Sequence, residues 1–246
     1  MSRRLRDGLV TLLLVLFAWQ VIVWVTGVPH FILPGPVLVI TALYEHRLVI
    51  AENAWVTILE VLVGLVLGAL LGGLTALHLM VSPLARRFLL PVLVFSQAVP
   101  VFALAPLLTL WLGYGIWSKI VMALLIIYFP VASTFYDGLR RTDPGLLDLA
   151  ATMGAKPRQT LLRIRLPAAL PSFASGLRLA AVYAPIGAVI GEWVGASQGL
   201  GYLMLLASGR VKIDLLFAAL LVLASFTVIL HAVIGRLADR LTRRVT

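Results

Sequence analysis

Long apolar runs separated by short polar stretches are the main pattern along this chain of 246 residues. Six runs reach about 18 to 25 residues, the length that a helix needs to cross a bilayer. The six predicted spans are Leu9–Gly27, Val56–Met80, Phe88–Leu112, Ile116–Phe135, Ser172–Ile190 and Leu215–Ala238. The pattern therefore predicts an all-α membrane protein with six transmembrane helices.

The composition agrees with a membrane location. Hydrophobic residues make up 61% of the chain, whereas soluble domains contain about 45–50% apolar residues. A soluble fold of this size could not bury so much apolar surface, so lipid must form part of its surroundings.

The basic residues divide unequally between the two sides of the predicted membrane. Numbering the loops alternately places sixteen on the side of the N-terminus: Arg3, Arg4, Arg6, Arg86, Arg87, Arg140, Arg141, Lys156, Arg158, Arg163, Arg165, Arg178, Arg236, Arg240, Arg243 and Arg244. The other side holds four: Arg47, Lys119, Arg210 and Lys212. The positive-inside rule assigns the first side, with both termini, to the cytoplasm. Topology thus explains the net charge of +10 better than nucleic-acid binding does.

The first span has two interpretations. Arg3, Arg4 and Arg6 before an apolar run also suit a secretory signal peptide. The run is long, however, and Trp24–Gly27 lacks an A-x-A cleavage pattern, so we expect an uncleaved anchor helix.

Several catalytic chemistries are excluded or unsupported. The chain has no cysteine, and its four histidines are far apart in sequence, so no metal site is expected. Lys119, Lys156 and Lys212 are its only lysines, and none follows a glycine, so no Walker A motif is present. The segment Gly195–Gly199 matches the G-x-S-x-G nucleophile motif, but it follows an apolar span rather than a strand, so we interpret it as a flexible glycine-rich outer loop.

The longest cytoplasmic stretch, about residues 136–171, predicts two short helices. Asp143 suits an N-cap, Pro144 the first helical position, and Gly154 the end of the first helix near Met153. Pro157 suits the start of a second helix, which we expect Pro167 and Pro171 to bound. Such a basic hairpin with an apolar stripe either docks on a partner protein or rests on lipid headgroups.

This stretch resembles the coupling motif of binding-protein-dependent ABC importer permeases, E-A-A-x-x-x-G followed after nine residues by I-x-L-P. Here Asp148-Leu149-Ala150 occupies the E-A-A position, Gly154 is the glycine, and Ile164-Arg165-Leu166-Pro167 follows nine residues later. Asp replaces Glu and Leu replaces the first Ala. The resemblance implies that the segment contacts an ATP-binding subunit, through Asp148, Leu149, Ala150, Gly154, Ala155, Ile164, Leu166 and Pro167.

The resemblance also implies the architecture and the partners. It implies a MetI-like type I permease fold, with an anchor helix and periplasmic segment in residues 1–50 and the permease core in residues 51–246. Two ATP-binding subunits, which would bind ATP and Mg²⁺, a periplasmic substrate-binding protein and a second permease copy would complete a complex in the bacterial inner membrane. This chain would then hold no cofactor itself and would not be an enzyme.

Further segments resemble the nitrate, sulfonate, taurine and bicarbonate branch of this family. They are Leu33–Pro36, Leu107–Gly115 and Gly195–Leu203. Within it, Gln97–Pro106, Phe135–Pro144 and Gly191–Gly195 are most similar to the permeases assigned to hydroxymethylpyrimidine, a thiamine precursor. The resemblance implies such a pyrimidine as the solute, with sulfonate, taurine, nitrate or bicarbonate as alternatives.

Five polar residues in or near the spans are candidates for the translocation path: Glu60, Gln97, Tyr128, Tyr183 and Glu192. Glu60 continues a ridge of Gly64, Gly68 and Gly72, a pattern typical of close helix packing, and should therefore face the bundle. It either lines the path or makes a structural hydrogen bond between helices. A proton-coupled secondary transporter that uses Glu60, or a membrane scaffold, remains as an alternative class.

Overall fold

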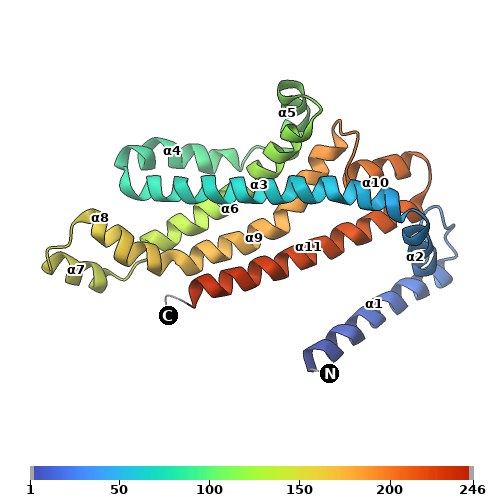
Figure 1. Ribbon diagram of the computed structural model, residues 1–246, viewed down its shortest axis with the longest axis horizontal. Helices are drawn as coiled ribbons and strands as arrows, with labels where there is room; N and C mark the ends of the chain where they lie inside the picture. Colours follow the sequence, from blue (N-terminus) through green and yellow to red (C-terminus); the bar gives the residue numbers. More distant parts are fainter. Residues whose placement is uncertain (1–2, 244–246) are drawn as a thin grey trace.

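The computed structural model describes residues 3–243, which form helices and connecting turns without a strand (Figure 1). The elements are α1 (Arg3–Thr26), α2 (Pro36–Glu45), α3 (Arg47–Val81), α4 (Pro83–Ser96), η1 (Val101–Leu104), α5 (Ala105–Leu112), α6 (Ile116–Arg140), α7 (Pro144–Thr152), α8 (Pro157–Thr160), η2 (Leu161–Arg165), α9 (Leu166–Trp193), α10 (Leu200–Gly209) and α11 (Ile213–Thr242). The predicted all-α class is confirmed. Arg244, one of the sixteen basic residues, lies outside the described residues, as do the side chains of Arg3 and Arg4.

Four long helices, α3, α6, α9 and α11, run side by side as a bundle (Figure 1). The α6–α9 contact is the most extensive, followed by that between α3 and α6. We call the end that carries α7 and α8 the hairpin end, and the opposite end, which carries α10 and α2, the α10 end. Helix α1 lies apart from the bundle and approaches it near its own C-terminus, where the Trp19 and Phe217 ring centroids are 5.7 Å apart.

The predicted glycine ridge packs α3 against α6. A Cβ atom at Gly64 would lie 2.9 Å from the Ala123 Cβ, and one at Gly68 would lie 2.5 Å from a side-chain carbon of Ile127. Such distances are too short for two carbon atoms in contact, so only glycine allows this approach of the helices. The ridge fixes the part of α3 that carries Glu60, which is buried as predicted.

The long helices correspond to five of the six predicted spans, with ends that differ by a few residues. Each of α1, α3, α6, α9 and α11 is long and apolar enough to cross a membrane. Predicted span Phe88–Leu112 is wrong as a continuous helix, because α4 and the η1–α5 segment meet at 90°. Pro100 is extended at the break, with φ −61° and ψ 112°, and the residue before a proline also disfavours helix. The bent pair counts as a sixth span only if both arms are taken together.

The prediction that Pro167 and Pro171 bound the second hairpin helix is also wrong. A continuous helical segment of 37 residues runs from Pro157 through both prolines to Trp193. Its η2 portion is a π-helix that ends at Arg165, two residues before Pro167. The wider π turn separates the proline ring from the carbonyl that it would otherwise meet in the preceding turn, so the helix continues.

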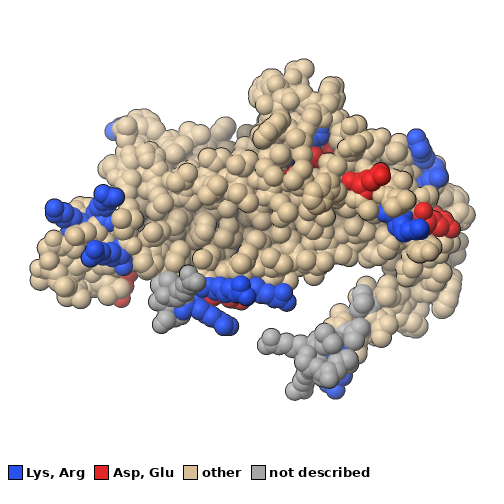
Figure 2. Space-filling model, in the orientation of Figure 1, with Lys and Arg blue, Asp and Glu red and all other residues tan. Residues whose placement is uncertain are grey.

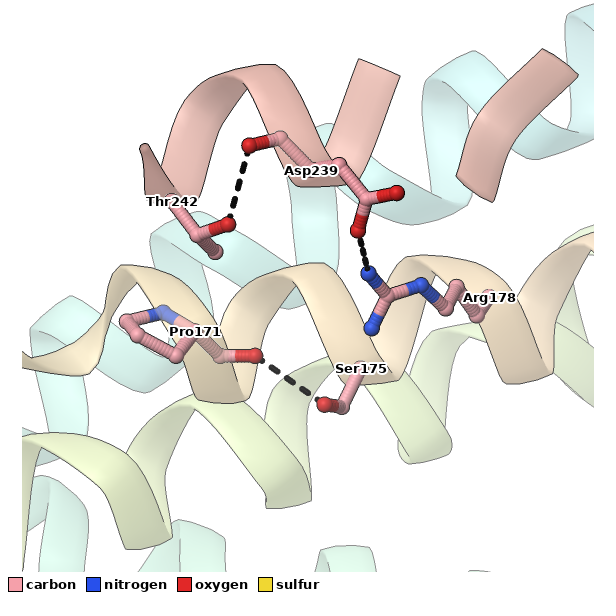
Figure 3. Close-up of polar contacts among 5 residues, drawn as sticks. All are labelled: Pro171, Ser175, Arg178, Asp239 and Thr242. Atoms are coloured by element: carbon pink, nitrogen blue, oxygen red, sulfur yellow. Dashed lines mark hydrogen bonds and ion pairs between the residues drawn. The ribbon is translucent and has the colours of Figure 1, made fainter. Parts of the chain in front are cut away.

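Charged side chains gather away from the middle of the bundle. On the face drawn in Figure 2, Lys and Arg lie at the hairpin end and along the lower edge, Lys and Arg accompanied by Asp and Glu lie at the α10 end, and tan residues fill most of the middle. Near the lower edge, the Arg178 guanidinium on α9 pairs with the Asp239 carboxylate on α11 (Figure 3). In the same view Ser175 donates to the Pro171 carbonyl and Thr242 to the Asp239 carbonyl, both within one helix.

Candidate functional site

Helix α10 begins in the interior of the α10 end, so its first backbone N–H groups need partners other than water. The Gly199 N–H donates to Asn53 Oδ1 at 2.8 Å, and the Leu200 N–H donates to Thr57 Oγ1 at 2.8 Å. The Gly201 N–H donates to Glu192 Oε2, and the Tyr202 N–H also donates to that carboxylate. From Leu203 onward the helix supplies its own acceptors. Two other helices, α3 and α9, therefore cap α10.

Glu192 is the centre of this arrangement. Its side chain is 1% exposed, and its Oε1 accepts a hydrogen bond of 2.6 Å from the Thr57 hydroxyl. A carboxylate is favoured at a helix N-terminus because the helix dipole and the free N–H groups are positive there. We call Asn53, Thr57 and Glu192 the interhelical cap.

Two glycines make room for the Glu192 carboxylate. A Cβ at Gly199 would overlap its carboxyl carbon, and a Cβ at Gly201 would lie 2.8 Å from its Oε2. Gly199 also has φ +115°, a conformation that residues with a Cβ rarely adopt. Gly199 therefore ties the end of the segment Gly195–Gly199 into the bundle, while Ser197 and Gln198 within the segment are exposed.

Glu60 and Lys119 lie beside the interhelical cap and are also buried. Glu60 lies one turn from Thr57 on the same face of α3, beside the Glu192 carboxyl, and its Oε2 has no hydrogen-bond partner among the described residues. Lys119 Nζ donates to the carbonyls of Tyr114 at 2.7 Å, Gly115 at 3.1 Å and Gly195 at 3.3 Å. The ammonium thus joins the start of α6 to the connection between α9 and α10.

The other three path candidates lie apart from this cluster. Gln97 is exposed at the break after α4, where its amide reaches Ser96. The Tyr128 hydroxyl donates to Thr75 Oγ1 at 2.8 Å and joins α6 to α3. Tyr183 is 41% exposed on α9. The structure therefore brings Glu60 and Glu192 together but does not bring Gln97, Tyr128 and Tyr183 to them.

The hairpin end is built from local hydrogen bonds. The Asp143 carboxylate accepts from the Gly145 N–H at 2.7 Å and so caps α7, as predicted. At the other end of α7, the Ala155 N–H bonds the Ala150 carbonyl and the Gly154 N–H bonds the Ala151 carbonyl, both at 2.9 Å. This is a Schellman turn, and it places Gly154 at φ +75°. The predicted glycine turn between two helices is confirmed.

The outer face of the hairpin presents apolar side chains to the surroundings. Leu146, Leu149 and Met153 are 49%, 57% and 77% exposed. Of the residues that the family resemblance assigns to partner contact, Asp148, Leu149 and Gly154 are exposed, whereas Ala150 is buried. Ala155, Ile164, Leu166 and Pro167 are half-buried. Ala150 therefore supports the hairpin, while Leu146 and Met153 enlarge its exposed face.

Arg165 fastens the hairpin to the bundle. Its guanidinium donates to the Leu139 carbonyl at the end of α6 at 3.1 Å and touches the Met80 sulfur, near the end of α3, at 3.9 Å. Leu139 is one of the last residues of α6, whose final carbonyls lack helical partners. The Arg165 side chain thus links the helical segment after the hairpin to the ends of α6 and α3.

Sequence reasoning missed Asn53, Thr57 and Lys119 as functional residues. Asn53 and Thr57 are four residues apart on α3, so they share one face, but their partners lie 146 and 143 residues away. Nothing in the local pattern indicates such partners. In the part of the chain that the structure describes, no group of His, Cys, Asp and Glu residues is suited to a metal ion.

A comparison with protein families matches residues 64–246 to one family, described as the binding-protein-dependent transport system inner membrane component. The chain belongs to this family of permeases. The matched range includes Lys119, Glu192 and the whole hairpin, and it begins after Asn53, Thr57 and Glu60.

Relatives support the same assignment. A protein of Haemophilus influenzae described as a probable ABC transporter permease is 51% identical over 98% of each chain. The formylaminopyrimidine transport permease ThiX of Halalkalibacterium halodurans is 38% identical over 77% of this chain and 76% of its own. These likenesses extend the resemblance seen in the hairpin sequence to nearly the whole length of the permease.

Solved structures show the same fold. A chain of the inward-facing methionine transporter MetNI superposes with a TM-score of 0.67 at 23% identity, over 82% of this permease and 98% of that chain. The expected MetI-like type I fold is confirmed, and this chain is a permease of the ABC importer type.

Proposed function

We propose that two copies of this permease form the solute path of an importer driven by two separate ATP-binding subunits. The observation that carries the proposal is the α7–α8 hairpin, a locally capped element with Leu146, Leu149 and Met153 exposed at its surface. An exposed apolar face on a rigid support is typical of a protein interface. The hairpin would fit a groove of the ATP-binding subunit, which also holds ATP and Mg²⁺.

This role implies an orientation. The hairpin end, with its arginines, would face the cytoplasm of the bacterium, and both termini would lie on the same side of the inner membrane. The α10 end would then face the periplasm, where a substrate-binding protein delivers the solute. The surface charge of the hairpin end supports this orientation (Figure 2).

The mechanism follows from one continuous helical segment. Pro157–Trp193 begins in the hairpin and ends one residue after Glu192, at the opposite end of the bundle. ATP binding would bring the two ATP-binding subunits together and move the hairpins with them. Each segment, fastened to α3 and α6 through Arg165, would then carry this movement to the α10 end and change which side of the path is open.

For the solute, we propose a pyrimidine precursor of thiamine. The support is the relative that is named a formylaminopyrimidine permease, together with the three segments that resemble hydroxymethylpyrimidine permeases. A further relative, 37% identical, is named a riboflavin permease, so riboflavin is the first competing solute to test. Taurine, sulfonates, nitrate and bicarbonate complete the test panel.

The experiment is reconstitution in proteoliposomes of the permease with its ATP-binding subunits and substrate-binding protein. We expect ATP hydrolysis to rise several-fold when the binding protein carries the pyrimidine, but not when it carries taurine or riboflavin. If only riboflavin raised ATP hydrolysis, the solute would be riboflavin, and the proposal of an importer would still stand. Solute uptake driven by a proton gradient without ATP would contradict the importer itself.

A further inference from the structure

We propose that the interhelical cap is a latch that holds the α10 end closed, with Glu192 as its ionised positioning residue and Glu60 as a neutral acid that donates to it. The latch fastens α10 and the connection 194–199 to α3, and its release frees them to move. The proposal rests on the proposed importer function only in its last step, in which this release opens the path on the periplasmic side.

The first observation is the complete set of acceptors for the N-terminus of α10. Asn53 and Thr57 of α3 and Glu192 of α9 accept the first four N–H groups, and Leu200 at the start of the helix is fully buried. If α10 moved away from α3, the N–H groups of Gly199 and Leu200 would lose their partners. A movement of α10 away from α3 therefore has to break the bonds of both Asn53 and Thr57.

The second observation assigns the charges. The two oxygens of Glu192 accept from Thr57, Gly201 and Tyr202, so Glu192 acts as an acceptor and is ionised. Glu60 is buried one turn along α3 from Thr57, beside that carboxylate, and its Oε2 has no hydrogen-bond partner among the described residues. Two neighbouring buried carboxyl groups cannot both be ionised when one of them lacks a donor. Glu60 therefore carries the proton. With one carboxylate and the Lys119 ammonium, the buried cluster is then electrically neutral.

These assignments predict an asymmetry between the two acids. In Glu60→Gln the amide still donates a hydrogen bond at the place of the acid proton, so the latch should hold. In Glu192→Gln one acceptor oxygen becomes an NH₂ group that meets backbone N–H donors or the Thr57 hydroxyl, so the latch should weaken.

The experiment uses the absence of cysteine from the natural sequence. Ala207→Cys places one thiol on the inner face of α10, where the side chain is 1% exposed. Its rate of reaction with a membrane-impermeant maleimide in vesicles measures how often α10 moves away from α3 and exposes the thiol. The matched control is Ser197→Cys, which is exposed in the same region and should react at one rate in every background.

In the Ala207→Cys background we expect Glu192→Gln to speed labelling by about tenfold or more, equivalent to about 1.4 kcal/mol in the opening equilibrium. Glu60→Gln should stay within about twofold of the parent. Equal rates for Glu192→Gln and the parent would overturn the latch. A Glu60→Gln rate as fast as that of Glu192→Gln would overturn the neutral state of Glu60.

A second pair of variants covers the case in which Glu192→Gln fails to reach the membrane. Thr57→Ser keeps the hydroxyl that joins Leu200 to Glu192, whereas Thr57→Val removes it at similar volume. The latch requires slow labelling with serine and fast labelling with valine, and equal rates for the two would overturn it. These labelling experiments need no ATP-binding subunit, so they test the latch even if the transport assay fails.

The last arm tests release during the transport cycle. Trapping the reconstituted Ala207→Cys complex in its ATP-bound state should speed labelling of the introduced thiol by about tenfold, and should change the Glu192→Gln variant of this complex much less. Unchanged labelling in a complex that still hydrolyses ATP would overturn the gating role while leaving the importer function intact.

Discussion

The two ends of this permease cap their short helices in opposite ways. At the hairpin end, Asp143 binds an N–H group two residues away and the Gly154 turn closes on the preceding residues. At the α10 end, the acceptors for Gly199 and Leu200 come from α3, 146 and 143 residues away. The hairpin can thus form and move as a unit, whereas α10 stays in place only while three helices remain assembled.

The two ends also differ in what they bury. The hairpin exposes leucines and a methionine, while the α10 end buries two glutamates, a lysine and a threonine. Exposed apolar groups favour a partner protein, whereas buried polar groups hold one specific arrangement because each loses its partner if the arrangement changes. The hairpin is therefore suited to binding and the α10 end to switching between states.

The largest expected effect is that of Glu192→Ala. Removing the carboxylate leaves the Gly201 and Tyr202 N–H groups without an acceptor and Lys119 without a compensating charge. We expect a loss of about 3–5 kcal/mol in the free energy of unfolding, measured as a lower melting temperature in detergent. Glu52→Ala, an exposed change on the same helix as Thr57, is the control. If Glu192→Ala and Glu52→Ala had equal melting temperatures, the buried polar groups of the α10 end would not hold one specific arrangement, and the contrast with the hairpin end would be wrong.

A smaller effect is expected from Gly68→Ala, which tests the contact that positions α3. The new methyl group would lie 2.5 Å from the Ile127 side chain, so α3 and α6 must separate slightly. We expect a loss of about 1–3 kcal/mol and, in the Ala207→Cys background, faster labelling of the thiol, because α3 carries two of the cap residues. Gly235→Ala has open space around it and should not destabilise the permease. Equal melting temperatures for the two variants would show that the ridge is not tightly packed.

Asp143→Ala tests the local cap directly against the distant one. Loss of this single exposed acceptor should weaken α7 by about 1 kcal/mol, and only α7 should respond. Amide hydrogen exchange should become faster within Pro144–Thr152, and the exchange rates within α10 should stay the same. Asp143→Ser retains a capping oxygen and should behave as the parent does. Exchange that also rises at α10 would mean that the two ends are not independent.

The smallest effect is expected at the Arg178–Asp239 pair (Figure 3). The Asp239 side chain is 60% exposed, and exposed ion pairs contribute about 0–1 kcal/mol. A double-mutant cycle with Arg178→Ala and Asp239→Ala in detergent should give a coupling energy in that range. A coupling as large as the loss in Glu192→Ala would place the main α9–α11 restraint here rather than at the α10 end.

Local patterns in the sequence were sufficient for the hairpin. Asp143, Pro144 and Gly154 each act on residues within one or two turns, so their spacing alone indicated two helices and a glycine turn. The glycine ridge was equally readable, because a four-residue repeat places its members on one helix face. The burial of Glu60 followed from its place on that ridge.

Three other features were not predicted, two because composition does not reveal local backbone geometry and one because it joins distant parts of the chain. Apolar composition does not distinguish a straight span from the bent pair at Pro100, and Pro167 continues a helix only because a π turn precedes it. The interhelical cap joins residues more than a hundred positions apart, as in the Thr57–Glu192 bond over 135 residues. Only the folded bundle reveals that Glu192 caps α10.

The most direct test of the permease assignment is whether the ATP-binding subunit is held by the hairpin. Leu149→Asp and Val211→Asp each place a charge at a side chain of similar exposure, 57% and 59%, at opposite ends of the bundle. Val211 has φ +58°, a conformation that aspartate tolerates. We expect Val211→Asp to co-purify with the ATP-binding subunit as the parent does, and Leu149→Asp to lose at least nine-tenths of it. Full co-purification by Leu149→Asp, or equal loss by both variants, would contradict the account.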